Sequence, residues 1–375
     1  MLLAVKYLVA SCRVFDPRGM GNKPERKYPV KKLIYLKTAC LCMLSGILFL
    51  TSCGNASVPS FSETVGMDSE APALSLSETA ETDSESPVPS LSETAVTFTD
   101  DLGRLVTVDR PERVACLIAS FADIWYLAGG AEQIVAATNA TWTYFDLPLR
   151  EDVVNLGATK ELNLEALIAC EPDLVLASCG TDRNLELEST FDRMGLTVAY
   201  FQVDTFEDYL RMLKICTEIT GLSENYEIYG SDVRTQVTEA LARADGSHPK
   251  VLYIRATGSS CKVKGSEGNV LGEMLANLDC ENIADRENSL LEQLSLEAIL
   301  QNDPDYIFVV LQSADPADAQ QVLETTLLKN PAWNTLRAVR EGRYYVMDPN
   351  LYNLKPNERW GEAYAELADI LYPAQ

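Results

Sequence analysis

Leu162-Asn-Leu-Glu-Ala-Leu-Ile-Ala-Cys-Glu-Pro-Asp-Leu-Val-Leu176 recurs about 130 residues later as Leu294-Ser-Leu-Glu-Ala-Ile-Leu-Gln-Asn-Asp-Pro-Asp-Tyr-Ile-Phe308. The glutamate and the proline are seven residues apart in both copies. Asn163 or Ser295 is suited to cap a short helix, the proline ends that helix, and the apolar run that follows is typical of a buried strand. Each copy is therefore one helix–strand unit, and the shared spacing predicts two similar lobes.

Short apolar runs alternate with helical periods around these two units, which is typical of an α/β fold. Strands are expected at 113–118, 134–137, 173–177, 197–203, 250–254, 305–311 and 343–347. Helices are expected at 121–129, 163–170, 184–194, 206–219, 269–278, 295–301 and 358–371. Ahead of them, Val96 to Val108 reads as a β-hairpin with its turn at Asp101 and Gly103.

A long polar helical period at 224–244 contains a single glycine and is expected to bridge the two lobes. We therefore expect an N-terminal α/β lobe at 96–222, a connecting helix at 223–247 and a C-terminal α/β lobe at 248–375. About 320 residues follow the first 52, which is enough chain for two ordinary domains.

Residues 1–52 have the features of a secretory signal peptide with an extended N-terminus. Six basic residues lie between Lys23 and Lys37, and the apolar run 38–50 is shorter than the roughly 20 residues that span a bilayer. Leu50-Thr-Ser-Cys53 resembles a bacterial lipobox, which implies cleavage before Cys53 and acylation of that cysteine. We expect a lipid anchor at the extracytoplasmic face of the cell membrane. The alternative is an uncleaved anchor with an ordinary cysteine.

Residues 53–95 begin with the lipidated cysteine and continue as an acidic linker. No Lys or Arg occurs between 54 and 95, and a Ser-Glu-Thr triplet recurs after Phe61, Leu76 and Leu91. A segment with so little apolar surface cannot offset the entropy of an ordered chain, so we expect a disordered spacer.

The charge balance disfavours nucleic acid as a partner. The chain has 31 Lys and Arg against 55 Asp and Glu, and beyond residue 52 the balance is 22 against 53. Nucleic-acid phosphates are bound by cationic surfaces, and a chain with this excess of acids is not expected to present one.

The six cysteines beyond Cys53 show no close spacing, so buried free thiols are favoured over a metal or redox cluster, with distant disulfides as the alternative. The single histidine, His248, disfavours direct binding of zinc or manganese, and no metal ligand is assigned.

Ligands of open α/β sheets collect beyond the carboxyl ends of the strands, so the segments after the expected strands are the binding candidates. The loop after 134–137 carries three aromatic residues, and the alternative role of Trp142 and Phe145 is to close the lobe's core. The later loops carry cations suited to anionic oxygens, whose alternative role is surface pairing with nearby acids. The candidate ligand-binding residues are Trp142, Tyr144, Phe145, Arg183, Arg255, Lys262, Gln312, Tyr352, Lys355 and Arg359.

Several further motifs accompany the repeats in a fixed order. They are Arg113-Val-Ala-Cys-Leu-Ile-Ala-Ser-Phe-Ala-Asp-Ile-Trp-Tyr-Leu-Ala-Gly129, Gly272-Glu-Met-Leu275 and Asn330-Pro-Ala-Trp-Asn-Thr-Leu-Arg-Ala-Val-Arg-Glu-Gly342. Together with the lipobox, this order resembles the solute-binding lipoproteins of bacterial ABC transporters for ferric siderophores, haem and cobalamin, the class III family with a helical backbone.

The resemblance implies two Rossmann-like lobes joined by one long helix, with a ligand cleft between them and no catalytic residue or cofactor. It implies a monomer that captures a small-molecule metal complex and meets an ABC permease with its ATPase. In this family an exposed acid on each lobe docks on the permease. Glu165 matches the first position, whereas Ala276 occupies the expected second position and leaves Glu273 one turn earlier.

Two other classes of function remain as alternatives. An enzyme or chelatase-like protein could use the same two-lobed fold, but the sequence has no Gly-x-Ser-x-Gly, phosphate loop or Gly-x-Gly-x-x-Gly. A surface adhesin or scaffold is the second alternative. The sequence does not specify which metal chelate would be bound.

Overall fold

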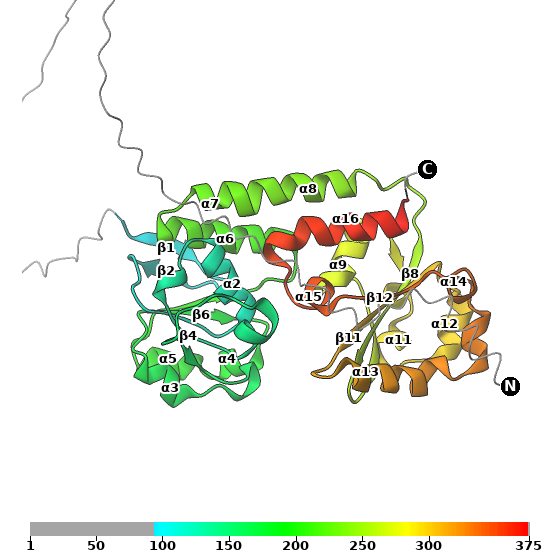
Figure 1. Ribbon diagram of the computed structural model, residues 1–375, viewed down its shortest axis with the longest axis horizontal. Coiled ribbons are helices and arrows are strands. Elements are labelled where there is room, and N and C mark those ends of the chain that lie inside the picture. The colour runs from blue at the N-terminus through cyan, green and yellow to red at the C-terminus, as the bar shows by residue number, and fades with distance from the viewer. Residues whose placement is uncertain (1–93, 374–375) are drawn as a thin grey trace, which may run out of the picture. The chain divides into compact units, whose positions relative to one another are not determined.

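The chain folds into two α/β lobes, each built on a mostly parallel sheet (Figure 1). The computed structural model describes residues 94–373, which fall within one compact unit. The strands of the first lobe are β1 (Val96–Thr99), β2 (Leu105–Val108), β3 (Val114–Cys116), β4 (Ile134–Ala137), β5 (Val154–Asn155), β6 (Leu174–Ser178) and β7 (Val198–Phe201). Its helices are α2 (Ala119–Leu127), η1 (Ala131–Gln133), η2 (Thr141–Phe145), η3 (Thr159–Glu161), α3 (Leu164–Ala169), α4 (Asp182–Glu186), α5 (Glu188–Arg193) and α6 (Phe206–Thr220).

The second lobe repeats this plan with a longer C-terminal part. Its strands are β8 (Lys250–Thr257), β9 (Cys261–Lys264), β10 (Glu281–Asn282), β11 (Tyr306–Gln312) and β12 (Tyr344–Met347). Its helices are α9 (Val270–Asn277), α10 (Ile283–Arg286), α11 (Asn288–Glu292), α12 (Leu296–Asn302), α13 (Pro316–Leu323), η5 (Glu324–Leu328), η6 (Pro331–Thr335), α14 (Arg337–Arg340), α15 (Pro349–Tyr352), η7 (Asn357–Arg359) and α16 (Trp360–Leu371).

The two sequence repeats occupy equivalent places in the two sheets. The first sheet has the strand order β5-β4-β3-β6-β7, and the second has the order β10-β8-β11-β12 with β9 antiparallel to β8. The repeats supply α3 with β6 and α12 with β11, and these strands pair in parallel with the first strand of their sheet, β3 or β8. The predicted two-lobed α/β fold is therefore confirmed.

The caps of the repeat helices form as predicted. The Asn163 side chain accepts a hydrogen bond from the Ala166 amide at 3.0 Å, and Ser295 accepts one from the Ala298 amide at 3.3 Å. Each cap satisfies one of the amides that the first helical turn leaves without an intrahelical acceptor.

The Pro-Asp pair of each repeat ends the helix and joins the strand to its neighbour. The residue before each proline, Glu171 or Asp303, has positive φ, which ends the helix before the proline ring. The Asp173 carboxylate then accepts hydrogen bonds from the Glu112 and Arg113 amides at 2.8 and 3.1 Å. In the second lobe the carboxylate of Asp305 accepts a hydrogen bond from the backbone amide of Lys250 at 2.9 Å. The aspartates thus fix the amino ends of paired strands in both lobes.

The predicted hairpin at the start of the fold is present and is held against the first sheet. Strands β1 and β2 pair antiparallel, and Gly103 in their turn has φ +80°, a conformation that glycine adopts without strain. The buried Asp100 carboxylate accepts two hydrogen bonds from the Arg104 guanidinium, at 3.0 and 2.8 Å, and one from the Tyr200 amide at 3.3 Å. Although burial favours the neutral acid, these bonds hold the pKa of Asp100 below its usual value.

The predicted connecting helix is present as a continuous run of three segments. They are α7 (Glu224–Tyr226), the π-helical turn η4 (Glu227–Ser231) and α8 (Asp232–Leu241). Gly230 lies in the π-helical turn, where a Cβ would meet the Tyr226 ring at 3.0 Å. Helix α16 packs along α8 (Figure 1), and Arg243 pairs with Asp369 at 2.5 Å.

The apolar core has one cluster that runs through both lobes and one further cluster in each lobe. Phe308 and Val310 on β11 join the shared cluster, whereas Ile307 and Val309 point to the other face of the sheet and join the cluster confined to the second lobe. This alternation gives the second sheet two distinct faces, and the face of Phe308 is the one that packs toward α9, α15 and α16.

The sequence-based assignments missed several short elements of the second lobe. Strand β9 pairs antiparallel with β8, and α10, α11 and α13 cover the sheet. No helix within residues 94–373 combines the length and the apolar character needed to cross a membrane. The predicted signal peptide, the lipidation site Cys53 and the acidic linker up to residue 93 lie outside the described residues, as do the last two residues of the predicted C-terminal lobe.

Candidate functional site

The loop after β4 presents one exposed aromatic ring, one half-buried ring and one that belongs to the core. Tyr144 is 48% exposed, and Trp142 is half-buried against the core cluster. Phe145 is 6% exposed and is a member of that cluster, which favours its alternative role of closing the lobe's core, and its role as a ligand contact stays a prediction. The one-turn π-helix η2, which packs against α2, turns Phe145 inward while Tyr144 points outward.

The strand register of the second lobe brings three predicted residues onto one face. Arg255 on β8 lies opposite Lys262 on β9, and Thr257 on β8 lies beside Gln312 on β11. Residues two apart on a strand share a face, so Arg255, Lys262 and Gln312 lie together at the carboxyl edge of the sheet. The sequence analysis did not assemble this group because it missed β9.

Tyr352 is buried inside the second lobe, and its role as a ligand contact stays a prediction that this burial disfavours. Its side chain is 1% exposed, and its hydroxyl donates to the Ala363 carbonyl at 3.0 Å or the Glu366 carboxylate at 2.9 Å. Burial, together with the negative charge of Glu366, raises the pKa of Tyr352 far above its usual value. The ring therefore supports the packing of α15 on α16.

Lys355 forms an ion pair that joins the two lobes. Its ammonium lies 2.9 Å from the carboxylate of Asp204, which follows β7 in the first lobe, and both side chains are about a quarter exposed. Asp204 also accepts a short hydrogen bond from the side-chain amide of Gln202. Burial alone would raise the pKa of Asp204, but the Lys355 charge and these hydrogen bonds hold it below the usual range. Sequence reasoning missed Asp204 because its partner is 151 residues away.

A second polar contact between the lobes centres on Asn357. Its side-chain amide donates to the Ser120 carbonyl at 3.0 Å and to the Asp123 carboxylate at 2.7 Å, and the residue is fully buried. Its φ is +52°, a region that asparagine tolerates better than most residues. Asn357 and the Phe206–Trp360 ring pair, 5.8 Å between centroids, fix η7 and α16 on the first lobe.

The two remaining predicted cations pair with acids three residues further along the chain. Arg183 lies 3.1 Å from the Glu186 carboxylate, and Arg359 makes two 2.7 Å contacts with Glu362. About a third of each arginine side chain is exposed. Both stay predictions as ligand contacts, because a ligand would have to compete with these acids.

The two predicted docking acids differ in their surroundings. Glu165 is exposed in the first turn of α3, where its charge suits the helix N-terminus. Glu273 is half-buried in the first turn of α9. Burial raises its pKa, with further contributions from the negative charges of Glu267 and of Asp204 across the lobes. Both docking roles stay predictions.

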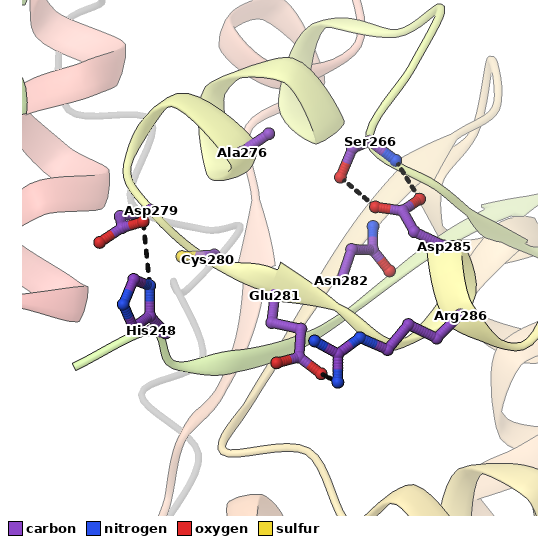
Figure 2. A pocket seen from close by; sticks show the side chains of 9 residues that line it. All are labelled: His248, Ser266, Ala276, Asp279, Cys280, Glu281, Asn282, Asp285 and Arg286. Atoms are coloured by element: carbon purple, nitrogen blue, oxygen red, sulfur yellow. Dashed lines mark hydrogen bonds and ion pairs between the residues drawn. The ribbon is translucent and has the colours of Figure 1, made fainter. Parts of the chain in front are cut away.

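A cavity of about 600 Å³ lies at the opposite, amino edge of the second sheet, where β10 pairs with the first residues of β8 (Figure 2). Its acidic and basic side chains already have partners: His248 lies 3.0 Å from Asp279, Arg286 lies 2.7 Å from Glu281, and Asp285 accepts hydrogen bonds from Ser266. Among residues 94–373 no cluster of three or more His, Cys, Asp or Glu could hold a metal ion. The six cysteines of this part of the chain are free, three of them buried.

Comparison with known proteins assigns the fold to a family. The sequence profile of a family described as periplasmic binding protein matches residues 114–351, which run from β3 to α15. The chain belongs to this family. The resemblance inferred from the sequence motifs is thereby confirmed.

Individual relatives cover most of the folded part. A cobalamin-binding protein of Halobacterium salinarum is 27% identical over 280 residues, which cover 72% of this chain and 74% of that protein. The uncharacterized ABC transporter substrate-binding lipoprotein YvrC of Bacillus subtilis is 24% identical over 288 residues, covering 74% and 86%. The periplasmic heme-binding protein RhuT of Roseiflexus has the same fold, with a TM-score of 0.56, 19% identity, and coverage of 70% of this chain and 98% of that structure.

Proposed function

We propose that this periplasmic binding protein is the solute-binding lipoprotein of an ABC importer. It captures an iron–siderophore-type complex, or a haem or corrinoid, and delivers it to the membrane permease. Cys53 carries the lipid anchor that keeps it at the extracytoplasmic face, and the chain acts as a monomer with the permease and its ATPase as partners. Binding needs no catalytic residue and no resident cofactor.

The observation that carries this proposal is the position of polar and aromatic residues at the carboxyl ends of the strands in both lobes. Trp142 and Tyr144 follow β4 in the first lobe, while Arg255, Lys262 and Gln312 gather on one face of the second. Small ligands of α/β proteins bind beyond these strand ends. The relatives that are named as binding proteins support capture without turnover.

The lobe-to-lobe contacts support a modest change of shape on binding. Lys355 pairs with Asp204, and Asn357 is buried against the first lobe, so the lobes are already fixed near α16. A ligand between the strand ends would meet aromatic surface from one lobe and cations from the other. Exposed Glu165 and, on the second lobe, Glu273 would then meet basic groups of the permease.

The test is a fluorescence titration of the purified full chain with ferric siderophores, haem and cobalamin. One of these is expected to bind saturably with 1:1 stoichiometry, and Trp142→Ala is expected to weaken it at least several-fold. Leu105→Ala, which removes a side chain 75% exposed on β2, is the matched control and should leave affinity unchanged. Turnover of the bound compound, or no binding to any of them, would reject the proposal.

The lipid anchor has its own test. Cells that express the full chain are expected to incorporate labelled palmitate into the protein and to retain it with membranes. Cys53→Ser should abolish both the labelling and the retention, whereas a labelled, membrane-bound Cys53→Ser protein would contradict the assignment.

A further inference from the structure

We propose that Arg255, Lys262 and Lys264 form one anion-binding site on the β8–β9 hairpin, which selects solutes with several negatively charged oxygens. The inference rests on the proposed function and narrows it, because a neutral corrinoid would gain little from such a site. An anionic ferric chelate, with catecholate or carboxylate oxygens, is the class of solute that fits.

The strand register places the three cations on the same face. Arg255 lies directly opposite Lys262, and Tyr253 lies directly opposite Lys264. Because alternate residues of a strand share a face, the two lysines of β9 and Arg255 point to the same side of the hairpin. The intervening Val263 and Cys261 point to the other side, where they join the apolar cluster of the second lobe.

No described acid neutralises this group. The ion pairs within residues 94–373 involve neither Arg255 nor Lys262 nor Lys264. The cations in the neighbouring loops behave differently, since Lys355 and Arg359 both pair with carboxylates. In a chain with 24 more negative than positive charges, an unneutralised cluster of three cations is unusual.

Like charges directly opposite each other destabilise a sheet, so this arrangement has a cost in the ligand-free protein. Arg255 and Lys264 are half-buried, which adds to that cost. Burial and then the charges of Arg255 and Lys262 lower the pKa of Lys264. A bound anion would relieve the repulsion and favour the charged form of all three side chains.

Arg255 lies beside the segment that contacts the first lobe, and Phe308 and Val310 on the same face of the sheet join the apolar cluster shared by both lobes. Its guanidinium donates to the Asn353 side chain at 3.4 Å, and Asn353 is two residues before Lys355, which pairs with Asp204 of the first lobe. The three cations therefore lie on the side of the sheet where the lobes meet. The same face continues to the sheet edge with Thr257 and Ser260, whose hydroxyls are 3.1 Å apart, so hydrogen-bond donors extend the site.

Lysines also occur on edge strands because their charge discourages pairing with another chain. That role would suit exposed Lys262 on β9, but Arg255 lies on β8, which has β11 as its other neighbour. A half-buried arginine on an interior strand does nothing to protect an edge. The geometry therefore favours a shared ligand over edge protection.

The test measures the affinity of the full chain for a ferric tris-catecholate, ferric citrate, haem and cyanocobalamin at several salt concentrations. At least one anionic probe should bind, more weakly as salt rises. Arg255→Gln should lower its affinity about tenfold or more, and Lys264→Gln and Lys262→Gln should each lower it several-fold. Lys250→Gln, which removes an exposed cation at the amino end of the same strand, is the matched control and should change nothing.

Four results would overturn the inference. Tight binding of cyanocobalamin alone would reject the anion site while leaving the proposed function intact. Unchanged affinity for an anionic probe in the three variants, together with a loss in Trp142→Ala, would place the solute away from the hairpin. Aggregation of the lysine variants with unchanged affinity would assign the lysines to edge protection. Binding of no probe would reject the proposed function and this inference together.

Discussion

Replacing Lys355 by Met is expected to weaken the contact between the two lobes. The substitution removes the ammonium 2.9 Å from the Asp204 carboxylate. That carboxylate stays about three-quarters buried, and among the described residues its remaining hydrogen-bond donor is the side-chain amide of Gln202. Removing one member of a partly buried pair costs more than removing an exposed one, because the remaining charge is left without compensation.

The magnitude follows from the burial of the pair. Two unit charges about 4 Å apart attract by about 4 kcal/mol in the effective dielectric near a protein surface, and desolvation of the two groups offsets much of this. We expect a coupling of about 1–3 kcal/mol, between the values of exposed pairs and fully buried ones. The same change at Arg183, whose Glu186 partner is 61% exposed, should cost no more than about 0.5 kcal/mol and is the control.

The assay is urea unfolding of wild type, Lys355→Met, Asp204→Asn and the double variant. The two single variants together are expected to lose more unfolding free energy than the double variant does. The difference is the coupling free energy of the pair. Losses that simply add, with a coupling below about 0.5 kcal/mol, would refute the view that this ion pair joins the lobes.

Three further predictions concern the scaffold. Asn163→Ala should cost about 1 kcal/mol in unfolding free energy by removing the α3 cap, whereas Asn163→Asp should retain most of it; equal losses in urea titrations would contradict the cap. The pKa of Asp100 lies below its usual value, so its contribution to stability is complete above about pH 4 and is lost as the pH falls through the folded-state pKa. Asp100→Asn should therefore flatten the acid dependence of the unfolding free energy. An unchanged slope of that free energy against pH would contradict the role given to Asp100. Gly272→Ala should destabilise the second lobe by about 1–3 kcal/mol, because its Cβ would lie 2.3 Å from the Gly265 carbonyl oxygen. The control is Gly180→Ala, whose Cβ would have no neighbour nearer than 3.4 Å and which should melt like wild type. Equal melting temperatures for the two variants would refute the packing argument.

Local features of the fold could be predicted because the chain encodes them within a few residues. The caps Asn163 and Ser295, and the prolines that follow their helices, belong to short motifs whose chemistry has one favoured outcome. The central strands were also found, since strands buried on both faces read as continuous apolar runs. Strand β9 carried a usable signal that was missed, the alternating Cys-Lys-Val-Lys of residues 261–264.

The candidate site was predicted only in part because side-chain direction depends on tertiary packing. Position near the strand ends named Arg255, Lys262 and Gln312 as separate candidates, and only the strand register shows that they share a face. Position alone could not distinguish the exposed Tyr144 from Phe145 in the core. The contacts between the lobes were beyond sequence reasoning for the same reason. Asn357 donates a hydrogen bond to Asp123, which is 234 residues away in the sequence, and no local sequence pattern predicts such a contact.

The central claim is that a solute sits between the strand ends of the two lobes. Hydrogen exchange of the full chain, with and without a saturating chelate, tests it most directly. The account predicts slower exchange in the segments after β4, β8 and β11, with no change around the His248 cavity at the opposite edge of the second sheet. Protection confined to that cavity, or to the outer helices α3 and α12, would contradict it.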